Sequence, residues 1–121
     1  MAIVLIVDDE YFIREVAISM VEGWGHLVLS ADSVEDAMLH LSSIGRIDAL
    51  ITDVRLSAAR LGGFELAQQA RKLRPNLPVL YVSGLPLTDT TTALLVDSSQ
   101  FLKKPYSQDQ LQNAVQTLLA A

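Results

Sequence analysis

The sequence predicts an α/β domain built on a doubly wound, five-stranded parallel sheet. Apolar runs of strand length alternate with segments of helical periodicity from one end of the chain to the other. Two of these runs, residues 3–7 and 79–82, are apolar at every position. Such strands are typical of parallel sheets whose two faces are both covered by helices.

The five strands are expected near residues 2–7, 26–31, 48–53, 78–83 and 99–103. The alternation of strands and helices favours the flavodoxin-like strand order 2-1-3-4-5, with five helices. In such sheets ligands bind at the carboxyl ends of the strands, beside the point where the strand order reverses. The first and third strands flank that point, so the residues that follow them are the first candidates for a site.

Local signals mark the helix boundaries. Ser33 with Asp36, and Ser107 with Gln110, have the spacing of capping boxes and predict the starts of the second and fifth helices. Glycine and proline mark the end of the first helix and both ends of the third, at Gly23 and Gly25, Gly62 and Gly63, and Pro75.

The fourth helix is the weakest part of the pattern. Residues 85–99 should contain it, yet this stretch includes Pro86 and the run Thr90–Thr92. Proline blocks a helix interior, and threonine is a weak helix former. We therefore expect a short helix near residues 89–96 that is less stable than the others.

The composition bounds the class of protein. A chain of 121 residues, half of them apolar, fits one domain over residues 1–121. The net charge of −5 argues against direct binding of nucleic acid. The sequence has no cysteine, no signal-peptide pattern and no apolar stretch near the roughly 20 residues of a membrane span. A cytoplasmic protein that does not contact membranes is expected.

Charged side chains follow three of the predicted strands. Asp8, Asp9 and Glu10 come directly after the first strand, Asp53 ends the third, and Lys104 follows the fifth. Because the carboxyl ends of parallel strands share one edge of the sheet, these groups are expected to meet. Each of them alone has an ordinary explanation as a loop residue or a helix cap. Their joint placement favours a functional site.

Clustered carboxylates repel one another unless a cation joins them, and Mg²⁺ prefers such oxygen ligands. Asp9 and Asp53 are expected to bind the ion directly and Asp8 through water. The backbone carbonyl of Arg55 is expected as a further ligand.

A carboxylate near a metal ion can also attack phosphorus and form an acyl phosphate. That reaction needs a cation to neutralise the phosphoryl oxygens, and Lys104 would supply it. Ser83, at the end of the fourth strand, would add a hydroxyl donor. The pattern thus favours a site that gathers a metal ion and a phosphoryl group.

Four motifs resemble those of the receiver domains of two-component response regulators, and the match covers essentially the whole chain. They are Val7-Asp8-Asp9-Glu10, Thr52-Asp53-Val54-Arg55, Val82-Ser83-Gly84 and Phe101-Leu102-Lys103-Lys104-Pro105-Tyr106. The resemblance implies that Asp53 is the phosphoacceptor, that Asp8 and Asp9 hold Mg²⁺, and that Lys104 pairs with the phosphoryl group. It also implies a switch formed by Ser83 and Phe101, and a cis peptide bond before Pro105.

The function implied is that of a phosphorelay signalling module, which is not an enzyme beyond its own phosphorylation and dephosphorylation. A histidine kinase or histidine phosphotransfer protein would donate the phosphoryl group, and an unknown downstream protein would bind the switched surface. The chain resembles a stand-alone, chemotaxis-regulator-like receiver, since no linker follows the last helix. It would be a monomer or a phosphorylation-dependent dimer.

Two departures from the family pattern stand out. Ser57 occupies the place of a usual proline, and Gly63 follows Asp53 by two residues more than is usual. The loop at residues 57–62 is therefore expected to be longer than in the family. The weak fourth helix is the second departure.

Two other functions remain open. One is a pseudo-receiver that docks partners without phosphorylation; the other, less favoured, is an Mg²⁺-dependent aspartyl-phosphate phosphohydrolase. Near the site, Tyr11, Phe12 and Tyr106 form a candidate kinase-docking patch. Packing of Phe12 in the core is an equally good explanation for that residue.

Overall fold

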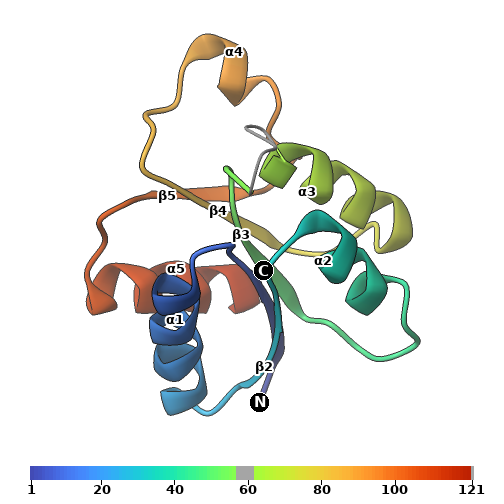
Figure 1. Ribbon diagram of the computed structural model, residues 1–121, viewed down its shortest axis with the longest axis vertical. Helices are drawn as coiled ribbons and strands as arrows, with labels where there is room; N and C mark the ends of the chain where they lie inside the picture. Colours follow the sequence, from blue (N-terminus) through green and yellow to red (C-terminus); the bar gives the residue numbers. More distant parts are fainter. Residues whose placement is uncertain (57–61, 121) are drawn as a thin grey trace.

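Five parallel strands form a sheet in the order β2-β1-β3-β4-β5, which confirms the predicted topology (Figure 1). The structure is a computed structural model that describes residues 1–56 and 62–120. The strands are β1 (Ile3–Val7), β2 (Leu27–Ala31), β3 (Ala49–Asp53), β4 (Val79–Ser83) and β5 (Gln100–Lys103). The loop expected to be longer than usual, residues 57–62, lies outside the described residues except for Gly62.

Helices cover both faces of the sheet (Figure 1). On one face lie α1 (Tyr11–Gly23) and α5 (Gln108–Ala120). On the other lie α2 (Val34–Leu41) and α3 (Gly62–Leu73). We call these the α1/α5 face and the α2/α3 face.

The central strands are buried on both faces, which explains their continuous apolar sequences. In β1, Val4 and Ile6 belong to the core on the α1/α5 face, whereas Leu5 and Val7 belong to the core on the α2/α3 face. All four side chains are at most 2% exposed. Because side chains alternate along a strand, each face takes every second residue.

The predicted caps occur at the starts of α2 and α5. The Oγ of Ser33 accepts a hydrogen bond from the backbone N–H of Asp36 (3.1 Å), and Ser107 Oγ accepts one from Gln110 (3.1 Å). At the C-terminal end of α1, Trp24 is the cap residue, and it packs against the core of the α1/α5 face. Gly25 follows with φ +94°, a conformation that side chains rarely adopt.

The fourth helix, α4 (Asp89–Thr92), has only four residues, so the prediction of a short helix is confirmed. Thr88 and Thr91 cap its start reciprocally, each accepting the other's backbone N–H. The expected end at residue 96 is wrong. The residues after α4 include Leu94, Leu95 and Val96, which pack against the core of the α2/α3 face instead of extending the helix. In Figure 1, α4 projects away from the sheet.

Across residues 1–56 and 62–120, no helix combines the length and the apolar character that crossing a membrane requires.

Candidate functional site

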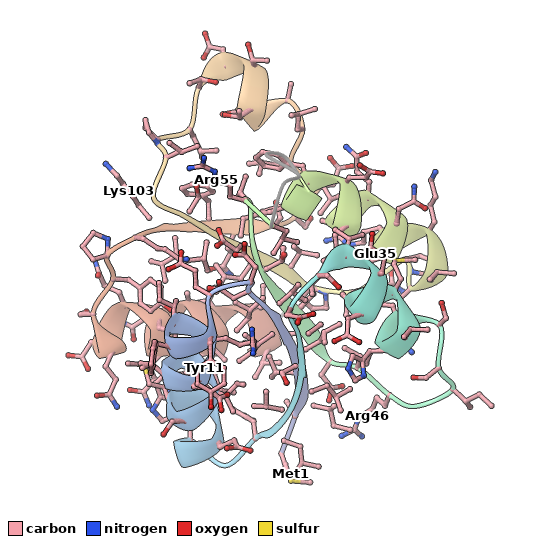
Figure 2. All side chains as sticks on the ribbon, in the orientation of Figure 1. Met1, Tyr11, Glu35, Arg46, Arg55 and Lys103 are labelled. Carbon is pink, nitrogen blue, oxygen red and sulfur yellow. The ribbon has the colours of Figure 1, made fainter. Side chains whose placement is uncertain are left out.

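The candidate site lies where the carboxyl ends of four strands meet. Asp8 follows β1, Asp53 and Ser83 end β3 and β4, and Lys104 follows β5. In Figure 2, Arg55 and Lys103 mark this end of the sheet, and Met1 and Arg46 mark the opposite end. The parallel topology therefore brings together side chains that are up to 96 residues apart in the sequence.

One ammonium group joins two nearly buried carboxylates. Lys104 Nζ lies 3.3 Å from Asp8 Oδ2 and 3.2 Å from Asp53 Oδ2. Asp8 and Asp53 are only 6% and 7% exposed. The backbone N–H of Lys104 donates to the Ser83 carbonyl (2.8 Å), which ties the residue to the end of β4. The Lys104–Pro105 peptide bond is cis.

The charges at the site do not balance. Burial raises the pKa of Asp53, Lys104 lowers it and Asp8 raises it, and the net result is a pKa above its usual 3.8. Burial alone would lower the pKa of Lys104, but the two carboxylates outweigh it and raise that pKa. The lysine therefore stays charged, while the carboxylates hold more negative charge than it compensates.

Hydrogen bonds between side chains and backbone fix the loop that carries the acidic residues after β1. Asp8 Oδ1 accepts the N–H of Glu10 (2.9 Å), and Arg14 Nη1 donates to the Asp8 carbonyl (2.8 Å). Glu10 is the N-terminal cap residue of α1, yet its side chain forms no capping hydrogen bond. Across the site, Asp53 Oδ1 accepts the N–H of Arg55 (3.3 Å).

Three carboxylates form a group that suits a divalent cation. Oxygen atoms of Asp8, Glu10 and Asp53 all lie within 4.8 Å of one another. Such a set of oxygen donors, with two of the three residues buried, fits the requirements of Mg²⁺. The site opens into a hollow of about 530 Å³, which we call the acidic hollow. Asp9 and Arg55, both expected as Mg²⁺ ligands, line it together with Glu10, Asp53 and Lys104.

Glu10 is the residue to which sequence reasoning gave no role of its own. Its position directly after Asp8 and Asp9 was a signal, but spacing alone does not say which of three successive acids faces Asp53. The loop geometry decides this, because the extended backbone of Glu10 (φ −90°, ψ 113°) lets its carboxylate reach the group.

A glycine allows α3 to approach the phosphoacceptor candidate. The N–H of Gly63 donates to the Val54 carbonyl (2.9 Å). A Cβ on Gly63 would collide with the Asp53 carbonyl oxygen and lie 2.7 Å from the Val54 Cα. Both obstacles are backbone atoms, which cannot turn aside as a flexible side chain can.

Next to the acidic hollow lies an apolar one of about 590 Å³, lined by Phe12, Ile13, Val16, Met20, Gly84, Lys104, Pro105 and Tyr106. Phe12 is 80% exposed and Tyr11 is 59% exposed, so the alternative that Phe12 packs in the core is wrong. Tyr106 is half-buried, and burial raises its pKa. Lys104 and Gly84 border both hollows, so an occupant of the apolar one would lie beside the carboxylates.

A family model described as response regulator receiver domain matches residues 4–116. The chain therefore belongs to the response regulator receiver domain family. A receiver protein from Sinorhizobium medicae is 32% identical, with a TM-score of 0.89 over 99% of this chain and 95% of that one. The response regulator TrrA of Thermotoga maritima, solved in complex with Mg²⁺-BeF, is 25% identical with a TM-score of 0.83, over 98% and 100% of the two chains.

A longer relative is the nitrogen assimilation regulatory protein NtrX of Azorhizobium caulinodans, which is 28% identical over 120 residues. The match covers 95% of this chain but 26% of that protein, so the chain spans about a quarter of its length.

Replacing Gly63 with Ala should destabilise the fold by about 1–3 kcal/mol or more, because the new methyl group overpacks against backbone. Urea unfolding measures the change. Gly23→Ala is the matched control, since a Cβ at Gly23 meets nothing within 4 Å. The control should be neutral, or stabilising by up to about 1 kcal/mol. Equal effects of the two substitutions would contradict the close approach.

Replacing Asp53 with Asn should stabilise the metal-free protein at pH 7. The raised pKa means that the folded state binds the Asp53 proton more tightly than the unfolded chain. The wild type therefore loses stability as the pH rises from about 3.8 through the raised value, and the Asn variant escapes this loss.

Urea unfolding in EDTA from pH 3 to pH 7 tests this, with the exposed Asp97→Asn as control. The advantage of Asp53→Asn should shrink toward pH 3. If Asp53→Asn were less stable than the wild type at pH 7, the prediction would be wrong. The ion pair of Asp53 with Lys104 would then stabilise the fold more than burial of the Asp53 carboxylate destabilises it.

Proposed function

We propose that the chain is a phosphoacceptor domain that receives a phosphoryl group on Asp53 from a phosphohistidine of a histidine kinase or phosphotransfer protein. The observation that carries the proposal is the Lys104 ammonium group, which bridges the buried Asp53 carboxylate and Asp8 (3.2 and 3.3 Å). A cation at that position is placed to neutralise oxygens of a group attached to Asp53. Membership of the receiver family supports the same role.

The transfer is an in-line displacement at phosphorus. An oxygen of the Asp53 carboxylate forms the new bond to phosphorus while the bond from phosphorus to the imidazole nitrogen breaks. The electron pair of the broken bond returns to the histidine ring. Because Lys104 stays charged, it can pass from pairing with carboxylates to pairing with phosphoryl oxygens without a proton transfer.

We further propose that Mg²⁺ is held by the carboxylates of Asp9, Glu10 and Asp53, with the carbonyl oxygen of Arg55 as a further ligand and Asp8 acting through water. The ion would withdraw negative charge from the phosphoryl oxygens during the transfer. The uncompensated negative charge of the site and the Mg²⁺-BeF complex of TrrA support this assignment.

Ser83 and Phe101 form the proposed switch. Both line an apolar hollow of about 440 Å³ together with Phe64 and Val54, on the side of the sheet where α3 begins. Ser83 also lines the acidic hollow. A turn of its hydroxyl toward a phosphoryl group on Asp53 would leave room for the ring of Phe101.

The phosphoryl donor would dock on the aromatic patch formed by the exposed Tyr11 and Phe12 and the half-buried Tyr106. The apolar hollow beneath Phe12 borders the acidic one through Lys104 and Gly84, so a donor seated there faces Asp53. The downstream partner would be another protein in the cytoplasm, and no direct contact with nucleic acid or membrane is proposed.

Incubation with Mg²⁺ and acetyl phosphate or phosphoramidate should add one phosphoryl group to the protein, as measured by intact mass. Asp53→Asn should abolish the addition, because the amide oxygen is a poor nucleophile. Undiminished labelling of the variant would overturn the assignment of Asp53. If neither protein gains mass and beryllofluoride does not bind, the pseudo-receiver is the better reading.

Glu10→Gln should weaken Mg²⁺ binding several-fold, because it removes one of three clustered negative charges. Isothermal titration calorimetry measures the affinity directly and does not depend on phosphorylation. Glu15→Gln, an exposed change on α1, is the control for net charge. Equal affinities of the two variants would remove Glu10 from the metal site.

A further inference from the structure

We propose that Arg14 is a positioning residue for the Mg²⁺ site, and that it connects this site to the aromatic patch on α1. Its guanidinium group contacts the loop that carries the acidic residues and also contacts one ring of the patch. The effect on Mg²⁺ rests on the proposed function; the contacts of Arg14 with the loop and with the ring do not.

The first contact fixes the loop after β1. Arg14 Nη1 donates a hydrogen bond to the backbone carbonyl of Asp8 at 2.8 Å. The carboxylate of Asp8 also accepts the N–H of Glu10 (2.9 Å) and pairs with Lys104 (3.3 Å). A hydrogen bond from a charged donor is roughly twice as strong as one between neutral groups. Arg14 therefore holds the backbone firmly at the first acidic residue of the loop.

The second contact limits the positions open to the guanidinium group. Arg14 Cζ lies 5.6 Å from the centre of the Tyr11 ring, within the range of a cation–π interaction. The Tyr11 ring in turn meets that of Phe12 edge to face, with centroids 5.5 Å apart. Tyr11 and Arg14 are three residues apart on α1, which places their side chains next to each other on the helix. A side chain held at both the ring and the carbonyl has little freedom to leave Asp8.

The metal ligands concerned lie on the same loop. Asp9 and Glu10 follow Asp8 directly, and the Glu10 carboxylate reaches the group that it forms with Asp8 and Asp53. The directions of these carboxylates depend on the path of the backbone after Asp8, which Arg14 fixes at its start. Groups that orient metal ligands typically contribute 10–100-fold to the affinity for the metal.

The positive charge of Arg14 acts against both the helix and the metal. Arg14 is the fourth residue of α1, and a cation near a helix N-terminus is unfavourable. A second cation beside the loop also repels a bound metal ion. The two roles therefore differ in sign. If Arg14 acted only through its charge, its removal would strengthen Mg²⁺ binding, whereas the loss of a positioning contact weakens it.

Isothermal titration calorimetry of the full chain, with Mg²⁺ alone as the probe, tests the role of Arg14. Arg14→Met removes both the hydrogen bond and the charge, and should weaken binding about tenfold. Lys72→Met, an exposed change near the C-terminal end of α3, removes the same charge and should leave the affinity unchanged. An affinity of Arg14→Met equal to or above that of the wild type would overturn the proposal.

Arg14→Lys separates charge from geometry. The ammonium group keeps the charge, but a compact donor cannot both reach the carbonyl and lie over the Tyr11 ring as the planar guanidinium group does. Mg²⁺ binding should therefore weaken in this variant as well. Wild-type affinity of Arg14→Lys would show that the charge is sufficient and would contradict the positioning role.

A double-mutant cycle tests the connection to the aromatic patch. Tyr11→Leu should weaken Mg²⁺ binding about two- to fivefold, the range expected for an exposed cation–π interaction. In the Arg14→Met background the same change should have no effect, because the guanidinium group that transmits it is gone. Equal effects in the two backgrounds, or no effect in the wild type, would overturn the connection.

Amide hydrogen exchange in EDTA, measured by NMR on the ¹⁵N-labelled full chain, tests the contact without metal. The Glu10 N–H, which donates to Asp8 Oδ1, should exchange several-fold faster in Arg14→Met than in the wild type. The amides of Leu111 and Val115 in α5 serve as the reference for global stability. An unchanged Glu10 rate would overturn the positioning of the loop. If the wild type binds no Mg²⁺, the proposed metal site fails, while the Glu10 rate still decides the role of Arg14.

Discussion

The Lys104 ammonium group bridges the carboxylates of Asp8 and Asp53. Burying any of these charged groups alone, without its partners, would be unfavourable. Two carboxylates taken out of water repel each other, and one ammonium group offsets only part of that cost. The site therefore stays short of positive charge. A divalent cation would pair with the carboxylates, and a phosphoryl group would pair with the ammonium group. The same residues can therefore bind both ligands at once. The rest of the fold serves to bring three distant chain segments to this bridge and to keep water from them.

Much of this arrangement follows from the sequence. The continuous apolar runs of β1 and of residues 79–82 in β4 indicate a sheet covered on both faces, and such a sheet places the residues at the carboxyl ends of its strands along one edge. The sequence alone therefore predicts that Asp8, Asp53, Ser83 and Lys104 lie together. The caps at Ser33 and Ser107 are equally local, because a hydroxyl and a backbone N–H three residues away determine them.

Other features depend on distances between segments, which no local pattern encodes. Glu10 joins the carboxylate group through the path of one loop. The hydrogen bond from Val96 to Tyr81 crosses fifteen positions of sequence and needs the exact depth of a buried ring. The sequence does not locate the end of α4, because Leu94 to Val96 are equally apolar in a helix and in an irregular segment. Their packing against the core of the α2/α3 face favours the irregular path.

The position of Trp24, the only tryptophan of the chain, has an optical consequence. It caps the C-terminal end of α1, while Glu10 caps the other end, and 13 residues of helix, about 20 Å, separate them. Its indole packs against the core of the α1/α5 face, so its fluorescence reports whether that face is assembled. The fluorescence emission of Trp24 should not change when only the carboxylates of the site are affected. A spectral change during a titration would mean that the disturbance has travelled the length of the helix.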